Sequence, residues 1–432
     1  MMKYSVITFG CRVNQADSLA FEEELRVRGA TTAASPDDAD VVIVNTCSVT
    51  SSADQGARQT VRRLARINPN AKVVVTGCYA TRRPDAFGGL TNVLRVVPNS
   101  DKSSVVSLLA ADLGLTTSER FGDGDGSCGS AIEPGVAGRT AFTLRVQIGC
   151  AQRCAYCIIP TTRGAPRSVP LDGVLSEVDR TVRAGFKEIA LTGVHLGSYG
   201  RDLHPASSLI ELLRKLEEWH GLKTVPYTDT RFRISSLEPM DCSHEVVDLV
   251  ARHDCFAPHF HLPLQHASDH VLSAMRRPYT RAYYAGLVGS IRARIPSASI
   301  GSDVIVGFPG ETDEDFEELC GFLEQSPLTH VHVFPYSDRP GTEASAMSER
   351  IPGAVIRERA ARVRDVGRRL VVRFRESQLG TTHRALTLED GTLAVTGNYL
   401  KVRIPAGHVR NEWIRLKVTA AGETMRGEAV DE

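Results

Sequence analysis

Short apolar runs alternate with amphipathic segments along most of this 432-residue chain, and this alternation constrains the fold more than any other feature. In the first third the apolar runs are YSVITF, ADVVIVN and AKVVVTG, separated by SLAFEEELRVRG and GARQTVRRLARIN. Val- and Ile-rich runs separated by helical patterns are typical of parallel sheets covered by helices. We therefore predict a small parallel α/β domain at residues 1–113.

A second series of the same kind follows a change in composition. Residues 114–138 are dominated by Gly, Ser, Pro and Asp and are predicted to be a linker. The expected strands beyond it are FTLRVQIG, EIALTGV, RFRISSL, HFHLPLQ, SIGSDVIVGFP and HVHVFPY, with amphipathic segments between them. Six strands joined by crossover helices favour a partial parallel (β/α)6 barrel over a flat doubly wound sheet for residues 139–368.

The C-terminal part begins with a long predicted helix, residues 355–376, which is rich in arginine. Its apolar stripe would consist of Ile356, Val363, Val366 and Leu370. Short alternating strands with Gly turns follow, so residues 369–432 are expected to hold a small antiparallel β barrel.

Charge and apolar content narrow the class of protein. Lys+Arg and Asp+Glu both number 51, so bulk charge argues neither for nor against nucleic acid. Apolar runs stay below the ~18 residues that a membrane span needs, and the first residues lack a secretory pattern. We expect a cytoplasmic protein, in which the ten cysteines would be metal ligands, catalytic thiols or core residues.

Local arginine clusters could still bind RNA. Besides the long helix, with its eight arginines, clusters occur at residues 58–66, 82–83, 163–167 and 276–277. Any single cluster can be a solvated helix face. Together, beside a β barrel, they favour contacts with phosphates.

Three cysteines, Cys150, Cys154 and Cys157, stand in the stretch GCAQRCAYCIIPTTRG, directly after the first expected barrel strand. Loops at the carboxyl ends of barrel strands carry the chemistry of such folds. Three thiolates can hold three irons of a 4Fe–4S cluster and leave the fourth iron open. A zinc site with a distant fourth ligand, or three core cysteines, are the alternatives.

A second set of three, Cys11, Cys47 and Cys78, is dispersed in the sequence, and each follows a predicted strand of the N-terminal sheet. The carboxyl ends of parallel strands share one edge of a sheet, so these residues are expected to converge. On position alone they could also be three buried cysteines, which behave as small apolar residues.

The C-x3-C-x2-C spacing is that of the radical S-adenosylmethionine (SAM) superfamily. The stretches TFGCRVNQADS, NTCSVTSSADQGARQ and VVVTGCYA resemble the N-terminal domain of the methylthiotransferase family. The resemblance implies a 4Fe–4S cluster on each set of cysteines, SAM bound at the open iron of the barrel cluster, and a 5′-deoxyadenosyl radical formed when SAM is cleaved. It also implies a C-terminal TRAM domain that binds RNA.

The stretches LTGVHLGSYG, RISSLEP and VHVFPYSDRPGT resemble the branch of the family that acts on threonylcarbamoyladenosine in tRNA. The implied reaction adds a methylthio group to C2 of that adenine at position 37, beside the anticodon, and uses a low-potential electron donor of the flavodoxin or ferredoxin type. The sequence departs from the branch pattern in LPLQHASD, where Ser-Gly-Ser is expected after the Gln and His266 and Ala267 begin the stretch.

SAM contacts are expected from loops at the ends of barrel strands. Gly193 would admit the methionine moiety because it has no side chain. Tyr156 lies inside the cysteine motif, Ser235 and Ser236 could bond the ribose or carboxylate, and Val306 and Phe308 could lie near the adenine. Ordinary barrel packing is the alternative for each of these residues.

Four histidines alternate on two expected strands, His259 with His261 and His330 with His332. Histidines two apart share a face and can bind metal, but satisfied interior side chains or RNA contacts are favoured. The other cysteines, Cys128, Cys242, Cys255 and Cys320, are interpreted as structural.

Two further hypotheses remain open from sequence alone. The same chemistry could act on isopentenyladenosine in tRNA or on an aspartate of a ribosomal protein. The chain could instead be a non-catalytic RNA-binding protein with a structural metal.

Overall fold

A computed structural model describes residues 2–113, 134, 140–221 and 229–431. Most of the predicted linker at 114–138, including Cys128, lies outside these residues. The chain divides into two compact units, each described by itself. The first comprises Met1–Ile132, Ile148–Gln152 and Ile158–Ala165, and the second comprises Glu133–Gln147, Arg153–Cys157 and Pro166–Glu432.

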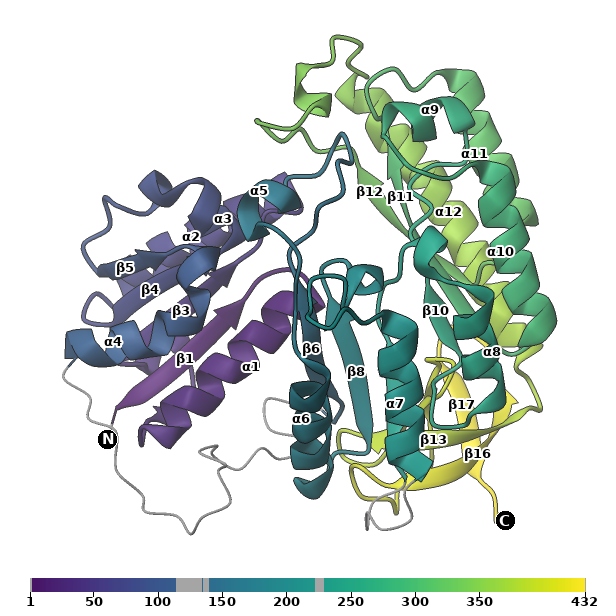
Figure 1. Cartoon of the computed structure of the whole chain (residues 1–432), viewed down its shortest axis with the longest axis horizontal. Coiled ribbons are helices and arrows are strands. Elements are labelled where there is room, and N and C mark those ends of the chain that lie inside the picture. The colour runs from purple at the N-terminus through teal and green to yellow at the C-terminus, as the bar shows by residue number, and fades with distance from the viewer. Residues whose placement is uncertain (1, 114–133, 135–139, 222–228, 432) are drawn as a thin grey trace. The chain divides into compact units, whose positions relative to one another are not determined.

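The first unit holds a five-stranded parallel sheet in the order β2-β1-β3-β4-β5, drawn in purple and blue in Figure 1. Its strands are β1 (Lys3–Thr8), β2 (Thr31–Thr32), β3 (Val41–Thr46), β4 (Lys72–Gly77) and β5 (Val93–Val97). The helices are α1 (Arg12–Val27), α2 (Ser51–Ile67), α3 (Cys78–Arg82) and α4 (Val105–Leu113). The predicted parallel α/β domain is confirmed.

Both faces of this sheet are covered, which explains the unbroken apolar run of β3. Val42 and Val44 pack in one core cluster with Val61 and Leu64 of α2. Val41 and Ile43 point to the opposite face and pack with residues of α1 and α4. Burying each such side chain stabilises the fold by about 1.5–3 kcal/mol.

The second unit contains the predicted partial barrel, built from two sheets in the orders β7-β6-β8-β9 and β10-β11-β12. An isolated parallel bridge pairs Phe232 of β9 with Phe256, three residues before β10 begins. The strands are β6 (Phe142–Ile148), β7 (Arg167–Ser168), β8 (Glu188–Gly193), β9 (Arg231–Ile234), β10 (His259–His261), β11 (Ser299–Val306) and β12 (His330–Pro335).

Helices cover the outer face of these strands. They are α6 (Leu171–Arg183), α7 (Leu209–Gly221), α8 (His244–Arg252), α10 (Arg281–Arg294), α11 (Asp313–Gln325) and α12 (Gly353–Ser377). Two shorter helices are α5 (Ile159–Arg163), which falls in the first unit, and α9 (Asp269–Ala274). The long α12 lies beside β12 (Figure 1). Within the described residues, no helix is long and apolar enough to cross a membrane.

The apolar stripe predicted for α12 is confirmed. Val363, Val366 and Leu370 are buried and Ile356 packs against the same core, together with Val304 and Val306 of β11. Successive side chains of a strand point to opposite faces. The residues of β11 next to Val304 and Val306, and the alternate residues of β12, therefore point toward the inner face of the barrel. Polar side chains therefore gather on that inner face.

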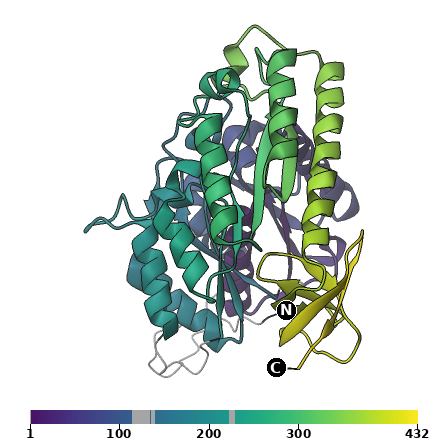
Figure 2. The same ribbon diagram turned by 90° about the vertical axis from the view of Figure 1, so that its right-hand side faces the viewer.

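A closed five-stranded barrel follows α12 and is drawn in yellow in Figure 2. Its strands are β13 (Thr382–Leu388), β14 (Leu393–Thr396), β15 (Lys401–Arg403), β16 (Trp413–Ala420) and β17 (Met425–Ala429). It is not wholly antiparallel as predicted, because β15 pairs with β17 in parallel. The boundary predicted at residue 369 falls inside α12.

A buried ion cluster ties the C-terminal barrel to the larger one. Glu188 of β8 accepts hydrogen bonds from Arg231 at 2.5 Å and from Arg233 at 3.0 Å, both on β9. Arg233 also donates to the carbonyl oxygen of Gly397 at 2.9 Å. Burial alone would raise the pKa of Glu188, but Arg233 and Arg231 outweigh it and lower this pKa to about 2.

We expect Glu188→Gln to lower the free energy of unfolding by roughly 3–5 kcal/mol, because two buried guanidinium groups lose their counter-charge. Chemical denaturation measures this loss. The matched control is Glu245→Gln, which removes an exposed partner of Arg214 and should change stability by no more than about 1 kcal/mol. Equal effects of both variants would contradict the structural role of Glu188.

The same carboxylate sets a dependence on pH. Its pKa is lowered in the folded chain, so its contribution to stability is present above the ordinary value of 4.5 and lost as the pH falls toward about 2. Denaturation at a series of pH values should show this loss in the wild type and not in Glu188→Gln.

Candidate functional site

The cysteines of the C-x3-C-x2-C motif lie in the loop between β6 and α5, and all three are partly exposed. Backbone contacts hold this loop: the Cys150 N–H donates to the Gly164 carbonyl at 3.1 Å, and the Cys157 N–H donates to the Cys154 carbonyl at 3.0 Å. Gly149 has a φ of +77°, and a Cβ there would lie 2.0 Å from the Ala165 carbonyl oxygen. The loop is thus fixed by its main chain, while its thiols remain accessible to a ligand.

A buried arginine supports the second cysteine of this motif. Arg277 donates from Nη1 to the Cys154 Sγ at 3.1 Å and forms an ion pair with Glu238. Burial would lower the pKa of Arg277, but Tyr156 and Glu238 outweigh it and raise this pKa above its ordinary value. Arg277 therefore stays charged beside the thiol, and the phosphate contact predicted for it is wrong.

Two of the residues predicted to contact SAM meet in one apolar cluster. Phe308 is fully buried, and Tyr156 packs against the same cluster. The Tyr156 hydroxyl lies 3.5 Å from Arg277 Nη1, and burial raises its pKa well above the ordinary value. Tyr156 therefore links this apolar cluster to the charged pair beside Cys154.

The other predicted SAM contacts lie at strand ends. Gly193 ends β8, where an added Cβ would lie 3.1 Å from the Gln147 side chain. Ser235 is buried and Ser236 is exposed just beyond β9. The Val306 side chain packs in the core between the strands and their helices, so only its backbone can face a ligand on the inner side.

Glu311 organises the loop after β11, a role that the sequence alone did not reveal. Its Oε2 accepts hydrogen bonds from the backbone N–H of Gly307 at 2.6 Å and of Phe308 at 3.3 Å. Its other oxygen pairs with Arg359 of α12 at 2.5 Å. Burial raises the pKa of Glu311 despite these partners.

His266 is one of the two residues at which the sequence departs from the pattern of the branch. Its side chain is fully buried and lies 3.7 Å from Glu311.

Several arginines of α12 form ion pairs within the protein. Arg359 is buried and also contacts Asp313 at 2.5 Å. Arg362 pairs with Glu317, and Arg369 pairs with Glu324 of α11 at 2.5 Å. The phosphate contacts predicted for this helix are therefore wrong for Arg359, and the other two are held by acidic side chains.

Cys11, Cys47 and Cys78 follow β1, β3 and β4, which are neighbours in the first sheet. The φ of Gly10 is +92°, and a Cβ there would lie 2.3 Å from the Cys47 Sγ. Burial raises the pKa of Cys47 to about 11, and its neighbours Cys11 and Cys78 add to this shift. The structure thus brings the second set together at one edge of the sheet.

Arg163, on the short helix α5, is buried beside this second set. It forms an ion pair with Asp17 at 3.5 Å and bonds Asn14. Burial would lower the pKa of Arg163, but Cys78, Asp17 and Cys11 outweigh it, so the pKa lies above its ordinary value. Arg163 therefore stays charged next to the thiols, and a phosphate contact predicted for the 163–167 cluster is wrong for this residue.

A second cation lies in the same buried network. Lys102 Nζ contacts Asp17 at 2.6 Å and Asn14 Oδ1 at 3.2 Å. Asn99 Nδ2 lies 3.6 Å from the Cys78 Sγ. Arg163 and Lys102 thus share one carboxylate beside the second set, and burial lowers the pKa of Lys102.

The remaining cysteines in the described part of the chain are structural, as predicted. Cys242, Cys255 and Cys320 are buried in the main core cluster. Burial raises their pKa values to about 12, 12 and 11, which keeps these thiols protonated and unreactive.

Comparisons with known proteins agree with this architecture. Residues 3–97 match the model of the uncharacterized protein family UPF0004, and residues 144–323 match that of the radical SAM superfamily. The superfamily implies SAM and a 4Fe–4S cluster.

The similar relatives include named enzymes. The threonylcarbamoyladenosine tRNA methylthiotransferase MtaB of Aquifex aeolicus is 36% identical, covering 93% of this chain and 96% of the relative. The Bacillus subtilis enzyme of the same name is 35% identical over 82% of this chain and 78% of its own. A tRNA-2-methylthio-N(6)-dimethylallyladenosine synthase of Symbiobacterium thermophilum is 33% identical over 98% and 93%.

Solved structures share the fold at low identity. The radical SAM methyltransferase TsrM of Kitasatospora setae, with tryptophan and a SAM analogue bound, has a TM-score of 0.53 and 18% identity, covering 71% of this chain and 64% of that one. The cobalamin-dependent enzyme OxsB has a TM-score of 0.53 and 10% identity, covering 85% and 56%. The solved structures share only the fold, whereas the three named tRNA-modifying relatives are 33–36% identical over most of this chain. On this similarity, the chain belongs to the radical SAM tRNA methylthiotransferase family of enzymes.

Proposed function

We propose that this enzyme adds a methylthio group to C2 of N6-threonylcarbamoyladenosine at position 37 of tRNA, and that two 4Fe–4S clusters take part. The observation that carries the two-cluster proposal is the pair of three-cysteine sets, each placed after parallel strands and beside a buried arginine. The names of the relatives from Aquifex aeolicus and Bacillus subtilis support this nucleoside.

A second candidate substrate is dimethylallyladenosine, the isopentenyl nucleoside, in tRNA. The relative from Symbiobacterium thermophilum supports it, because the match covers 98% of this chain at 33% identity. The cysteine sets do not distinguish the two nucleosides, since both reactions modify the same kind of adenine carbon.

Cys150, Cys154 and Cys157 would hold the radical SAM cluster, and Cys11, Cys47 and Cys78 the second cluster. Three sulfur donors fit a 4Fe–4S cluster that keeps one iron open for a further ligand. When bound, the first cluster supplies the electron that cleaves SAM and the second supplies sulfur. Residues of the chain hold and charge-balance these thiols.

The two buried arginines have parallel tasks. Arg277 donates a hydrogen bond to Cys154 and is itself fixed by Glu238. Arg163 is held by Asp17 and Asn14 and acts on Cys78 and Cys11. A cation beside a thiol favours the thiolate, the form that binds iron. Both arginines thus favour cluster binding.

Exposed cations on the C-terminal barrel are better placed for tRNA than the paired arginines of α12. Arg403 of β15 is in register with Arg426 of β17, so both lie on one face. Arg415 and Lys417 of β16 and Lys401 of β15 are also exposed. These side chains present positive charge from three neighbouring strands, as phosphate binding requires.

Single substitutions should separate the two clusters. We expect the reconstituted wild type to hold about eight irons, and Cys154→Ala and Cys47→Ala about four each. Cys154→Ala should lose SAM cleavage, measured as 5′-deoxyadenosine formation. Cys47→Ala should keep cleavage but lose methylthiolation.

Cys320→Ala is the matched control, because this buried cysteine belongs to neither set. It should retain both the iron content and the activity. Zinc in place of iron, or SAM cleavage by Cys154→Ala, would contradict the proposal and favour a structural metal.

The nucleoside is tested in cells. In a strain that lacks the gene, methylthiolated threonylcarbamoyladenosine should be missing from digested tRNA in mass spectrometry, and a plasmid copy should restore it. Loss of the methylthiolated dimethylallyl nucleoside instead would establish the second candidate.

Replacement of Arg163 should change the reduction potential of the second cluster. In a Cys154→Ala background, where only that cluster remains, Arg163→Ala should lower its reduction potential, because a nearby positive charge stabilises the reduced form. Potentiometry followed by EPR measures the shift.

Two controls define the cause. Arg163→Lys keeps the charge and should largely restore the potential, while Arg167→Ala removes an exposed arginine four residues away and should leave it unchanged. An unchanged potential in Arg163→Ala would contradict an electrostatic role.

A further inference from the structure

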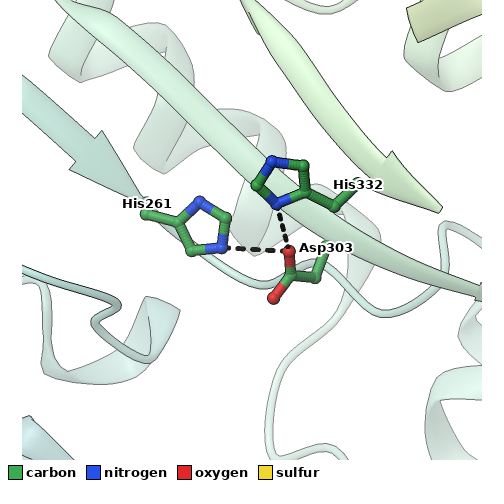
Figure 3. A group of neighbouring side chains, drawn as sticks. All are labelled: His261, Asp303 and His332. Carbon is green, nitrogen blue, oxygen red and sulfur yellow. Dashed lines mark hydrogen bonds and ion pairs between the residues drawn. The ribbon is translucent and has the colours of Figure 1, made fainter. Parts of the chain in front are cut away.

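Three polar side chains that belong to neither cysteine set converge on the inner face of the partial barrel. They are His261 of β10, Asp303 of β11 and His332 of β12 (Figure 3). The register of the parallel strands explains the meeting: His261 is opposite Gly301, and Asp303 is opposite His332. Residues 301 and 303 share a face, so all three side chains project to the same side.

Both histidines point at one carboxylate oxygen. His261 Nε2 lies 3.0 Å and His332 Nδ1 lies 3.1 Å from Asp303 Oδ1, as the dashed lines of Figure 3 show. The three atoms lie within 4.8 Å of one another. The His332 side chain is 59% exposed, which leaves the group open to an ion from solution.

Glycine makes room for this arrangement. A Cβ on Gly301 would lie 2.2 Å from His330 Nε2 and 3.0 Å from His261 Nδ1. The imidazoles of His261 and His330 therefore occupy space that any other residue at position 301 would take. The ligand side chains are carried by hydrogen-bonded strands rather than by a loop, so their backbones are fixed before an ion arrives.

The charge state of the carboxylate suits a cation. Burial would raise the pKa of Asp303, but hydrogen bonds from His261 and His332 outweigh it and hold this pKa well below its usual range. Nearby His330 is neutral at physiological pH, because burial and the adjacent His261 and His332 lower its pKa to about 4. One carboxylate and two imidazoles thus face each other, with His330 adding no further charge.

We propose that His261, Asp303 and His332 form a binding site for a divalent transition-metal ion, with zinc as the favoured ion. Two imidazole nitrogens and one carboxylate oxygen are a common zinc donor set, and three protein ligands leave a position for water or a substrate oxygen. Each imidazole would bind the ion through the nitrogen that faces Asp303, and the proton on that nitrogen would pass to the other ring nitrogen of a neutral ring or to water from a protonated ring. The zinc proposal does not depend on which nucleoside the enzyme modifies or on the presence of the second cluster.

The test uses the reconstituted holoenzyme, so that iron–sulfur clusters occupy the cysteines. After equilibration with zinc and removal of free metal, mass spectrometry of the elements should find about one zinc per chain in addition to iron. X-ray absorption at the zinc edge should show nitrogen and oxygen ligands without sulfur. Sulfur ligation would mean zinc on vacant cysteines and would overturn the assignment.

Substitutions test which side chains bind the zinc ion. His332→Ala and the near-isosteric Asp303→Asn should each weaken zinc binding at least tenfold, whereas His253→Ala, which removes a histidine paired with Glu217 elsewhere, should not. Zinc should raise the melting temperature of the wild type and of His253→Ala, but not that of Asp303→Asn. Absence of bound zinc at micromolar concentration, or undiminished binding in the variants, would show that the group is only a hydrogen-bonded network.

Discussion

Parallel strand pairing is the constraint on which the rest of this structure depends. Neighbouring parallel strands end at the same edge of the sheet. Residues that follow these strands therefore lie close together in space although they are far apart in sequence. Cys11, Cys47 and Cys78 meet in this way after β1, β3 and β4. The same rule, applied to register instead of strand ends, assembles His261, Asp303 and His332 across β10, β11 and β12. One pattern of hydrogen bonds therefore creates more than one cluster of side chains whose chemistry suits a metal.

The cysteines and the strands could be predicted because their signals are local. An apolar run, a turn and a cysteine at its end identify a site through sequence neighbours alone. The shortest elements gave no such pattern: β2 and β7 have two residues each and α5 has five. The end of the long helix was predicted to within one residue, at 376 against 377, but the domain boundary placed at residue 369 falls inside this helix.

The charged residues could not be predicted in the same way. Arg163 and Arg277 stand in short basic clusters that resemble exposed RNA contacts, yet both are buried beside cysteines. Their environment depends on partners far along the chain, Asp17 for Arg163 and Glu238 for Arg277. A sequence pattern that records only neighbouring positions cannot show whether such a partner exists. Glu311 was missed for the same reason, because its role comes from folding back onto the Gly307 and Phe308 N–H groups.

The docking of the C-terminal barrel relies on main-chain oxygens. Arg231 and Arg233 donate to the carbonyl groups of Arg384, Val395 and Gly397. A carbonyl is present whatever the side chain, so these hydrogen bonds place little demand on the identity of the residues that accept them. Other positions are constrained: Trp413 packs against the Arg231 guanidinium, and an added Cβ on Gly397 would lie 3.0 Å from the Pro258 ring. The outer surface of this barrel can therefore vary in sequence while these hydrogen bonds to its main chain stay the same.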